Sequence, residues 1–175
     1  SADSAGEWTN SALTFEILGA GTPRRQVRAA EQLMKESFDE WPTALLGNRC
    51  DDHCHALVAL NEQRELLAAC WFVICSDRHL NYLYCPAFAT RREFRGQGIG
   101  KAMAAELKAI ADGEQVVPKI AAELGSVALW QRWGFRGCRN KREDEWARLL
   151  DAEYGVFTRA STQLMFGMTR DEIAF

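Results

Sequence analysis

The sequence lacks a strong charge of either sign. Its 21 lysines and arginines nearly balance its 24 aspartates and glutamates, which leaves a formal net charge of −3 at pH 7. Proteins that bind nucleic acid or an anionic membrane surface usually carry a marked positive excess. We therefore expect no direct binding to nucleic acid and none to a membrane. A balanced total still allows a local basic pocket.

Long hydrophobic runs are also missing. No apolar stretch reaches the roughly 18 residues that a membrane-spanning helix needs. Residues 1–10 are small and polar and lack the apolar centre of a signal peptide. Three of the six cysteines, Cys70, Cys75 and Cys85, lie in apolar runs typical of buried strands, where thiols are common. These features predict an intracellular protein, of the cytoplasm or nucleus, with a flexible segment at residues 1–10.

The composition is that of an ordinary globular protein. Of the 175 residues, 47% are hydrophobic and 26% are charged, and no internal repeat or low-complexity tract is present. A chain of this length buries a sizeable core without dividing into several domains. We therefore predict a single domain over residues 11–175, which acts as a monomer or a dimer.

Hydrophobic periodicity predicts an alternation of strands and helices. Leu13–Leu18 alternates apolar and polar residues like a half-buried strand, whereas the apolar residues after Arg24 recur at helical spacing. Further strands are expected at His55–Leu60, Glu65–Cys75, Asn81–Thr90, Glu114–Ala121 and within Tyr154–Thr169, and further helices at Gly98–Ala111, Ser126–Trp133 and Asn140–Glu153. Pro86 predicts a bulge or a local break in strand pairing, because proline has no N–H to donate. This order of elements indicates an α/β fold with a sheet of mixed direction.

The most informative stretch is Arg95–Lys101 (RGQGIGK), which follows a predicted strand and opens a predicted helix. The first turn of a helix suits a phosphate, because its N–H groups have no partner within the helix and carry a partial positive charge. Glycines at Gly96, Gly98 and Gly100 let the backbone approach phosphate oxygens. A P-loop does not fit, since it needs four residues between its first glycine and Gly-Lys and only three are present. A dinucleotide fingerprint needs a third glycine where Lys101 stands.

A third pattern does fit. Arg95, Gly98 and Gly100 satisfy an Arg/Gln-x-x-Gly-x-Gly/Ala signature, and Trp130 stands four residues before the pair Gly134-Phe135. Together these motifs resemble the GNAT superfamily of N-acetyltransferases, whose loop binds the pyrophosphate of coenzyme A. The resemblance covers nearly the whole chain and implies an α/β fold with a mixed, mostly antiparallel, twisted sheet and helices on both faces. It also implies an acyltransferase that uses acetyl-CoA, and no metal, to acetylate a primary amine.

The resemblance assigns roles in cofactor binding to two neighbouring segments. Backbone groups of Phe88, Ala89 and Thr90 would pair with the pantetheine arm of acetyl-CoA at the end of the strand before the loop. The pyrophosphate would rest on the loop, whose assigned residues are Arg95, Gly96, Gln97, Gly98, Ile99, Gly100 and Lys101. Arg95 and Lys101 would add positive charge there.

The groups for proton transfer match the family less completely. An amine must lose a proton before it attacks a thioester, and the leaving thiolate must gain one. Some members of the family place a glutamate eleven positions ahead of Arg95, where this chain has Tyr84, and many place a tyrosine where it has Trp130. We predict Tyr84 as the catalytic residue, which would orient a water that carries the amine proton away. The alternatives are Tyr82, His79 and Glu93.

Two further features bear on partners. Cys50–His55 (CDDHCH) has the residue types of a zinc site, but no second Cys/His pair is apparent, so we interpret it as a polar loop and expect no metal. The chain is similar to the acetyltransferase domain of plant PHD-finger nuclear proteins in the runs Ala89–Arg91 and Phe94–Gly98, followed by Trp130 and Gly134-Phe135. This resemblance implies a protein lysine, such as a histone lysine, as acceptor. The alternative acceptor is a small amine or polyamine, and the alternative function is a non-catalytic acyl-CoA sensor.

Overall fold

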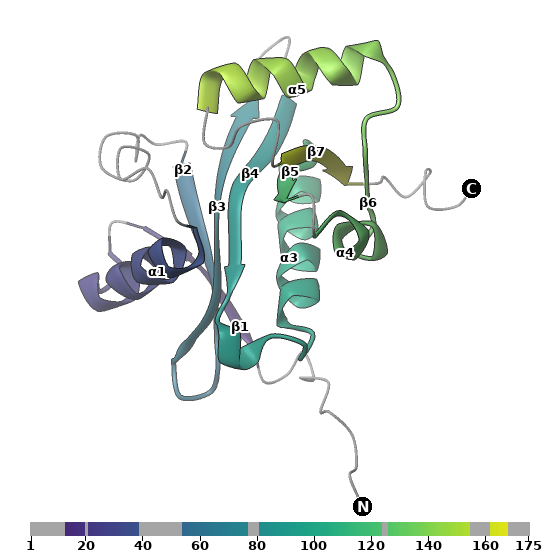
Figure 1. Ribbon diagram of the computed structural model, residues 1–175. Helices are drawn as coiled ribbons and strands as arrows, with labels where there is room; N and C mark the ends of the chain where they lie inside the picture. Colours follow the sequence, from purple (N-terminus) through teal and green to yellow (C-terminus); the bar gives the residue numbers. More distant parts are fainter. Residues whose placement is uncertain are drawn as a thin grey trace, which may run out of the picture. The chain divides into compact units, whose positions relative to one another are not determined.

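The computed structural model describes residues 13–19, 21–38, 54–76, 81–123, 126–154 and 162–167 (Figure 1). Its elements are β1 (Thr14–Leu18), α1 (Arg24–Ser37), β2 (Cys54–Leu60), β3 (Leu66–Ser76), β4 (Asn81–Thr90), the 3-10 helix η2 (Arg92–Phe94), α3 (Ile99–Gly113), β5 (Val117–Glu123), α4 (Val127–Arg132), β6 (Phe135–Arg136), α5 (Lys141–Tyr154) and β7 (Thr162–Gly167). The segment expected to be flexible, residues 1–10, lies outside the described residues and stays a prediction.

The seven strands form one sheet in the order β1-β2-β3-β4-β5-β7-β6. β1 pairs antiparallel with β2, and β7 pairs antiparallel with both β5 and β6. β4 and β5 are parallel, in a register that joins Tyr82 to Val117 and Cys85 to Ile120. The sheet is thus mostly antiparallel and includes a parallel pair, which confirms the predicted α/β fold of mixed strand direction.

The chain divides into two compact units. The first contains Ser1–Phe72 and Ala87–Leu107, and the second contains Val73–Pro86 and Lys108–Phe175. β3, β4 and α3 each contribute one end to each unit. Every residue predicted to bind the cofactor therefore belongs to the first unit, whereas Tyr84 belongs to the second.

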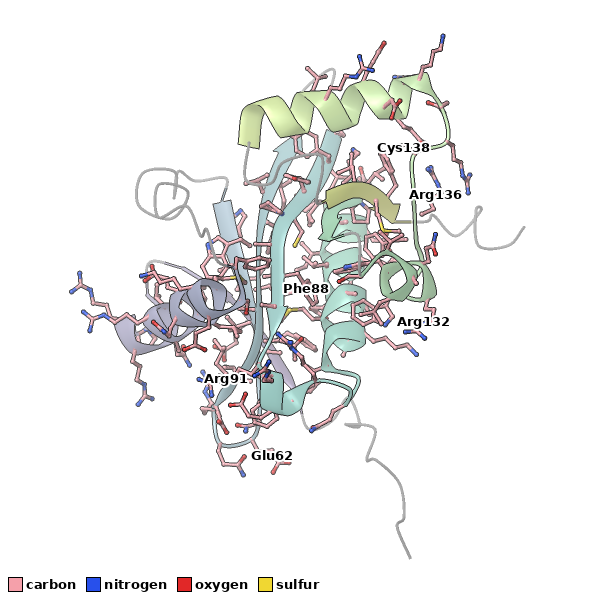
Figure 2. All side chains as sticks on the ribbon, viewed as in Figure 1. Glu62, Phe88, Arg91, Arg132, Arg136 and Cys138 are labelled. Carbon is pink, nitrogen blue, oxygen red and sulfur yellow. The ribbon has the colours of Figure 1, made fainter. Side chains whose placement is uncertain are left out.

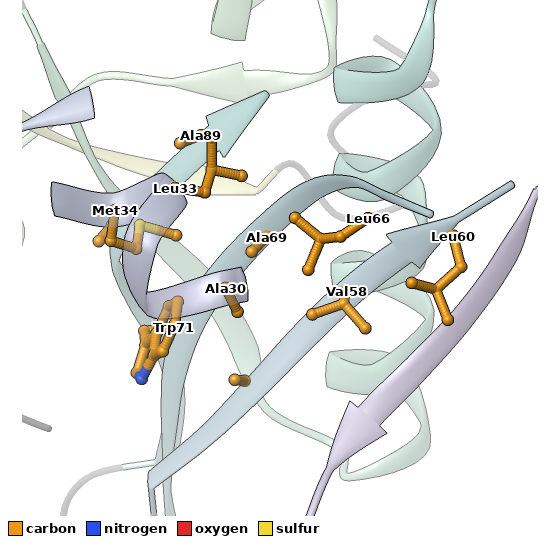
Figure 3. Close-up of a cluster of buried hydrophobic side chains, with 11 residues drawn as sticks. Ala30, Leu33, Met34, Val58, Leu60, Leu66, Ala69, Trp71 and Ala89 are labelled. Atoms are coloured by element: carbon orange, nitrogen blue, oxygen red, sulfur yellow. The ribbon is translucent and has the colours of Figure 1, made fainter. Parts of the chain in front are cut away.

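The core of the first unit forms between α1 and strands β2, β3 and β4 (Figure 3). α1 buries Ala30, Leu33 and Met34, at the helical spacing that the sequence predicts. The strand residues of this cluster are Ala56, Val58, Leu60, Leu66, Ala69, Trp71, Ala87 and Ala89. α1 and the first part of α3 lie on opposite sides of these strands (Figure 1), so helices cover both faces as expected.

The second unit packs α4 against β6 around aromatic rings. Trp130 is buried and meets Trp133 and Phe135 edge to face, with ring centroids 5.0 and 5.1 Å away. Lys108 Nζ donates to the carbonyls of Trp133 and Gly134 at 2.9 and 3.0 Å. Gly134 has a φ of +85°, which turns the chain from α4 into β6. The aromatic-x-x-x-Gly-Phe pattern therefore has a structural cause, since it supplies two packed rings and the glycine between them.

Each predicted helix and strand has a counterpart among the described residues, with boundaries shifted by a few positions. The sequence does not predict β6, because a two-residue strand has no detectable period. β4 continues through Pro86, and its pairing with β5 covers Tyr82 to Cys85, which ends at the residue before the proline. Cys70 and Cys85 are buried, as predicted. None of the described helices is both long and apolar enough to span a bilayer.

Replacing Gly134 by alanine is expected to lower the free energy of unfolding. An added Cβ would overlap Lys108 Nζ and displace it from the two carbonyls, and a φ of +85° is strained for a residue with a side chain. We expect a loss of about 1–3 kcal/mol, measured by urea denaturation. Gly113→Ala is the control, because nothing lies within 4 Å of an added Cβ there. An equal loss in both variants would contradict this explanation.

Candidate functional site

The predicted cofactor segment joins the end of β4 to the start of α3 (Figure 2). The N–H of Arg91 donates to the carbonyl of Leu67 on β3 at 2.8 Å, which holds the chain to the sheet as β4 ends. The turn of η2 follows and is closed by a bond from the N–H of Phe94 to the carbonyl of Arg91 at 3.0 Å. Backbone hydrogen bonds therefore anchor the loop at its start.

Two glycines determine the shape of the loop. Gly96 and Gly98 have φ values of +76° and +83°, in a region that residues with side chains rarely adopt. Nothing lies within 4 Å of an added Cβ at either position. Backbone conformation, and not crowding by the protein, therefore requires glycine here, and open space remains beside the backbone.

α3 begins directly after this turn. The N–H of Ala102 donates to the carbonyl of Gly98 at 3.0 Å, which opens the hydrogen-bond ladder of the helix. The N–H groups of Ile99, Gly100 and Lys101 come before it, so helix geometry gives them no acceptor within α3. The first turn of α3 contains no acidic side chain. This end of the helix thus has the donors and the partial positive charge that suit a phosphate.

Two side chains of the loop bond to its own backbone. Arg95 Nε donates to the carbonyl of Thr90 at 3.1 Å, and Gln97 Nε2 donates to the carbonyl of Glu93 at 3.4 Å. Arg95 thus folds back toward the end of β4 and keeps its charge beside the loop, while Lys101 is exposed on the first turn of α3. The phosphate contacts of both cations stay predictions, and Arg95 gains a structural role that the sequence does not reveal.

The end of β4 alternates between the two faces of the sheet. Ala87 and Ala89 belong to the core beneath α1, so the period of two places Phe88 and Thr90 on the other face. Both of the latter residues are half-buried, and Figure 2 shows Phe88 in the lower half of β4. The role predicted for Phe88, Ala89 and Thr90 in holding pantetheine uses their backbone groups and stays a prediction.

A polar cluster that the sequence analysis does not foresee supports the start of the loop. Asn61 is buried at the β2–β3 turn, where its Oδ1 accepts the N–H of Glu65 at 2.8 Å and its Nδ2 donates to Glu65 Oε2 at 3.2 Å. Arg91 Nη1 lies 3.3 Å from Glu65 Oε1. Because both charged groups are partly exposed, the pair contributes at most about 1 kcal/mol, and its main effect is to orient Arg91.

The structure places the candidates for proton transfer on different elements. Tyr84 and Tyr82 are buried on β4 in the second unit, two residues apart and therefore on one face. Glu93 is exposed on η2 in the first unit, and His79 lies outside the described residues. Trp130 is a core residue packed against two rings. Of the candidates, Tyr84 and Tyr82 are thus brought together.

The sequence analysis misses Lys119, in the middle of β5. Among the residues that the structure describes, Lys119 is the only buried charged side chain, with 3% of its surface exposed. It pairs with Tyr84 in the parallel register of β4 and β5. Its Nζ lies 5.2 Å from the ring centroid of Tyr82 and 5.7 Å from that of Phe166. A signal was visible, since this lysine alone interrupts the apolar run Val116–Ala122 (VVPKIAA).

Burial decides the ionisation of Lys119. Loss of hydration lowers the pKa of Lys119 from 10.5 to about 8, and the negative charge of Glu143 opposes the shift. Each aromatic ring favours the ammonium by about 0.5–2 kcal/mol, whereas removing an ion from water costs several kcal/mol. Desolvation therefore outweighs the ring contacts, and both the charged and the neutral amine are populated near pH 8.

The ring of Phe166 also contacts a second cation. The guanidinium carbon of Arg136 lies 5.3 Å from its centroid, and Arg136 donates to both carboxylate oxygens of Glu143 at 2.8 and 2.9 Å. Glu143 also accepts the N–H of Arg139 at 2.7 Å. Burial alone would raise the pKa of Glu143, but hydrogen bonds from Arg136 and from the Arg139 N–H hold it below its ordinary value. Arg136, labelled in Figure 2, is thereby fixed beside the ring.

Most of the Cys50–His55 patch lies outside the described residues. Its last residue, His55, stacks on Phe72 with ring centroids 5.3 Å apart. Within the described ranges, no group of three or more His, Cys, Asp or Glu side chains is arranged to hold a metal ion. The expectation that this patch is a polar loop stays a prediction.

Lys119→Met is expected to stabilise the fold near neutral pH. Methionine is also long and unbranched but needs no hydration, so it removes the cost of burying an ammonium. Between pH about 8 and 10.5 the folded wild type has lost a proton that the unfolded chain retains, so its stability rises with pH. In thermal melts, the advantage of the variant should therefore shrink from pH 7 to pH 10. An advantage that grows with pH would contradict this cause.

Comparison with solved structures shows the fold. Tetrahymena GCN5 has a TM-score of 0.67 at 14% identity, over 88% of this chain and 94% of its own. A chimera of the spermidine N-acetyltransferase SpeG from Vibrio cholerae and hSSAT has 0.64 at 14% identity, over 94% and 99%. A GNAT family acetyltransferase from Elizabethkingia anophelis with acetyl-CoA bound has 0.56 at 15% identity, over 91% and 100%. Comparison with curated protein sequences gives no significant match.

The sequence profile of the acetyltransferase (GNAT) family matches residues 24–135. This range runs from α1 to the first residue of β6 and contains the glycine loop, Lys119 and the Gly134-Phe135 pair. The profile and the shared fold agree, and the expected resemblance to this superfamily is confirmed. The chain belongs to the acetyltransferase (GNAT) family.

Proposed function

We propose that the protein is an acetyl-CoA-dependent N-acetyltransferase that moves the acetyl group to a primary amine. The observation that carries this proposal is the β4–α3 loop, where two glycines with positive φ leave open space beside a helix start without acidic side chains. Such a cradle suits a pyrophosphate. Acetyl-CoA bound to the similar Elizabethkingia anophelis protein supports this choice of ligand.

In the proposed complex the pyrophosphate lies on the backbone of Gly96–Lys101. The N–H groups of Ile99, Gly100 and Lys101 donate to its oxygens, and the side chains of Arg95 and Lys101 supply positive charge. The backbone of Phe88, Ala89 and Thr90 pairs with the pantetheine arm. The exposure of the loop and its unobstructed face support this arrangement.

The proposed chemistry is the attack of a neutral amine on the acetyl thioester. An alkyl ammonium ion has no lone pair to attack with, so the acceptor must first lose a proton. We propose that the Tyr84 hydroxyl orients the water that takes this proton. Its place on β4, two residues from Tyr82 on one face, supports a shared site for proton transfer.

The acceptor is proposed to be a primary amine, either a small polyamine or a protein lysine. A spermidine N-acetyltransferase chimera shares the fold over 94% of this chain, which supports a polyamine. The similarity of Ala89–Arg91 and Phe94–Gly98 to the domain of plant PHD-finger nuclear proteins supports a protein lysine. A second candidate function is a non-catalytic acyl-CoA sensor, which the packing of Trp130 into the core favours, since many relatives have a tyrosine there.

The loop backbone, more than its side chains, should determine acetyl-CoA affinity. Gly98→Val forces a β-branched residue into a φ of +83° and places side-chain atoms in the open space beside the loop. Calorimetric titration should show a Kd raised about tenfold or more, equivalent to about 1.4 kcal/mol. Gln97→Ala is the matched control, because it shortens a neighbouring side chain and leaves the glycines of the loop in place, so it should bind as the wild type does.

The same proteins distinguish enzyme from sensor. Wild-type protein mixed with acetyl-CoA and either spermidine or a histone-tail peptide should release free CoA thiol, which a thiol reagent detects. Release with one acceptor and not the other would identify the acceptor class. Binding without release would favour the sensor, and wild-type affinity in Gly98→Val would contradict the proposed pyrophosphate site.

Tyr84→Phe should slow the chemical step without weakening cofactor binding. The substitution keeps the ring and removes the hydroxyl, so packing on β4 should survive. We expect kcat to fall about 10²-fold or more, the range typical of losing a positioned proton-transfer group, with the Kd for acetyl-CoA unchanged. Steady-state kinetics and calorimetry together test this. Turnover at the wild-type rate would exclude Tyr84 from the step.

A further inference from the structure

Lys119 stands directly beside Tyr84. The two residues are register partners on the parallel strands β4 and β5, whose backbones are about 4.8 Å apart. Partners in a parallel register direct their side chains to the same face of the sheet, and Tyr82 joins them there because it lies two residues before Tyr84. The Lys119 Nζ, 5.2 Å from the Tyr82 ring centroid, confirms that the amine reaches this face.

Lys119 is buried beside aromatic rings. Only 3% of its surface is exposed, whereas the side chains of Arg64, Arg91 and Arg136 retain more exposure. The Lys119 Nζ lies near the rings of Tyr82 and Phe166, and the negative charge of Glu143 acts on it. A buried amine among rings costs stability, which a long apolar side chain of similar shape would not. A function therefore explains a lysine at this position better than stability does.

We propose that Lys119, as a neutral amine, is the base that accepts the acceptor's proton through the Tyr84 hydroxyl. The inference rests on the proposed N-acetyltransferase function and deepens it. The family resemblance does not identify the general base. The position that holds a glutamate in some members of the family is Tyr84 here, and Lys119 lies beside it. A lysine tuned toward pH 7–8 by burial is a recognised form of general base.

The proposed reaction begins with proton transfer from the acceptor. The acceptor ammonium gives one proton to the Tyr84 oxygen through the bound water, while the Tyr84 hydroxyl proton passes to Lys119 Nζ. The amine lone pair then forms the N–C bond to the acetyl carbonyl, and the C–S bond breaks with its electron pair on sulfur. The second proton on the amine nitrogen neutralises the thiolate. Lys119 returns its proton to water, so the products are an amide, CoA thiol and one proton.

The proposal predicts how activity depends on pH. The titratable and charged groups near Lys119 include Tyr82, whose ring lies beside its Nζ, the register partner Tyr84, and Glu143, which is bonded to Arg136. Burial lowers the pKa of Lys119 to about 8, so the neutral, proton-accepting form increases as pH rises through this value. Activity should therefore rise with an apparent pKa of about 8. If the charge itself were needed, activity would fall over the same range.

The test compares wild type with Lys119→Arg and Lys119→Met, using acetyl-CoA and the amine that the wild type acetylates. Arginine keeps the positive charge but does not deprotonate in proteins, and methionine keeps the length without a charge. Both variants should lose about 10²-fold or more in kcat and should lose the rise near pH 8 in kcat/KM. Acetyl-CoA affinity, measured by calorimetry, should be unchanged in both.

Lys108→Met provides the matched control. Lys108 is a second lysine of the same unit whose pKa burial lowers, but it caps the carbonyls of Trp133 and Gly134. This variant should melt at a lower temperature and keep the rise near pH 8. Lys119→Arg with wild-type kcat would overturn the inference in favour of a charge, and Lys119→Met with wild-type kcat would show a purely structural lysine. Absence of turnover in the wild type would instead refute the proposed function, and this inference with it.

Discussion

The passage from β4 into α3 requires a positive φ at Gly96 and again at Gly98, and the proposed cofactor site depends on this turn. Without it, the helix would not begin with its first N–H groups beside open space. The rest of the segment keeps the turn in place: Arg91 bonds to β3 through its backbone, and the Arg95 side chain holds the end of β4. In the proposed site, binding would therefore rely mainly on backbone geometry, and the Arg95 side chain also holds the loop itself.

In the second unit, the burial of Lys119 opposes the positive charge of its amine. Aromatic faces offset part of the lost hydration, at about 0.5–2 kcal/mol for each ring, while the desolvation of an ion amounts to several kcal/mol. The outcome for Lys119 is a pKa near 8, where a small change in pH alters the fraction of neutral amine greatly. Arg136 lies beside the same Phe166 ring, but it is stabilised as a cation because it donates two hydrogen bonds to the Glu143 carboxylate.

The sequence predicts the order of elements well because most of them show a clear period. The helix after Arg24 buries the face that its pattern indicates. The strand of Leu13–Leu18 forms as predicted, but its apolar Ile17 is 51% exposed while Glu16 is half-buried, and β6 is too short for any pattern. The glycine loop could be located because its chemistry is local, written in consecutive residues. Lys119 could not be matched to Tyr84 in the same way, since their proximity depends on the parallel register of β4 and β5. The Asn61, Glu65 and Arg91 cluster was hidden for the same reason, as a hairpin turn and a strand end meet only in three dimensions.

The register of Lys119 also bears on whether the protein is an enzyme or a sensor. A sensor needs only the loop and the end of β4, and both would work equally well with methionine in the middle of β5. If the protein did not need an amine in the middle of β5, the buried lysine would only lower its stability. Apolar replacements of buried charges are often neutral or stabilising. Proton transfer gives such a residue a use, because a base works best when its pKa lies near the pH at which it acts. The position of the lysine beside Tyr84, the proposed catalytic residue, therefore weighs in favour of catalysis.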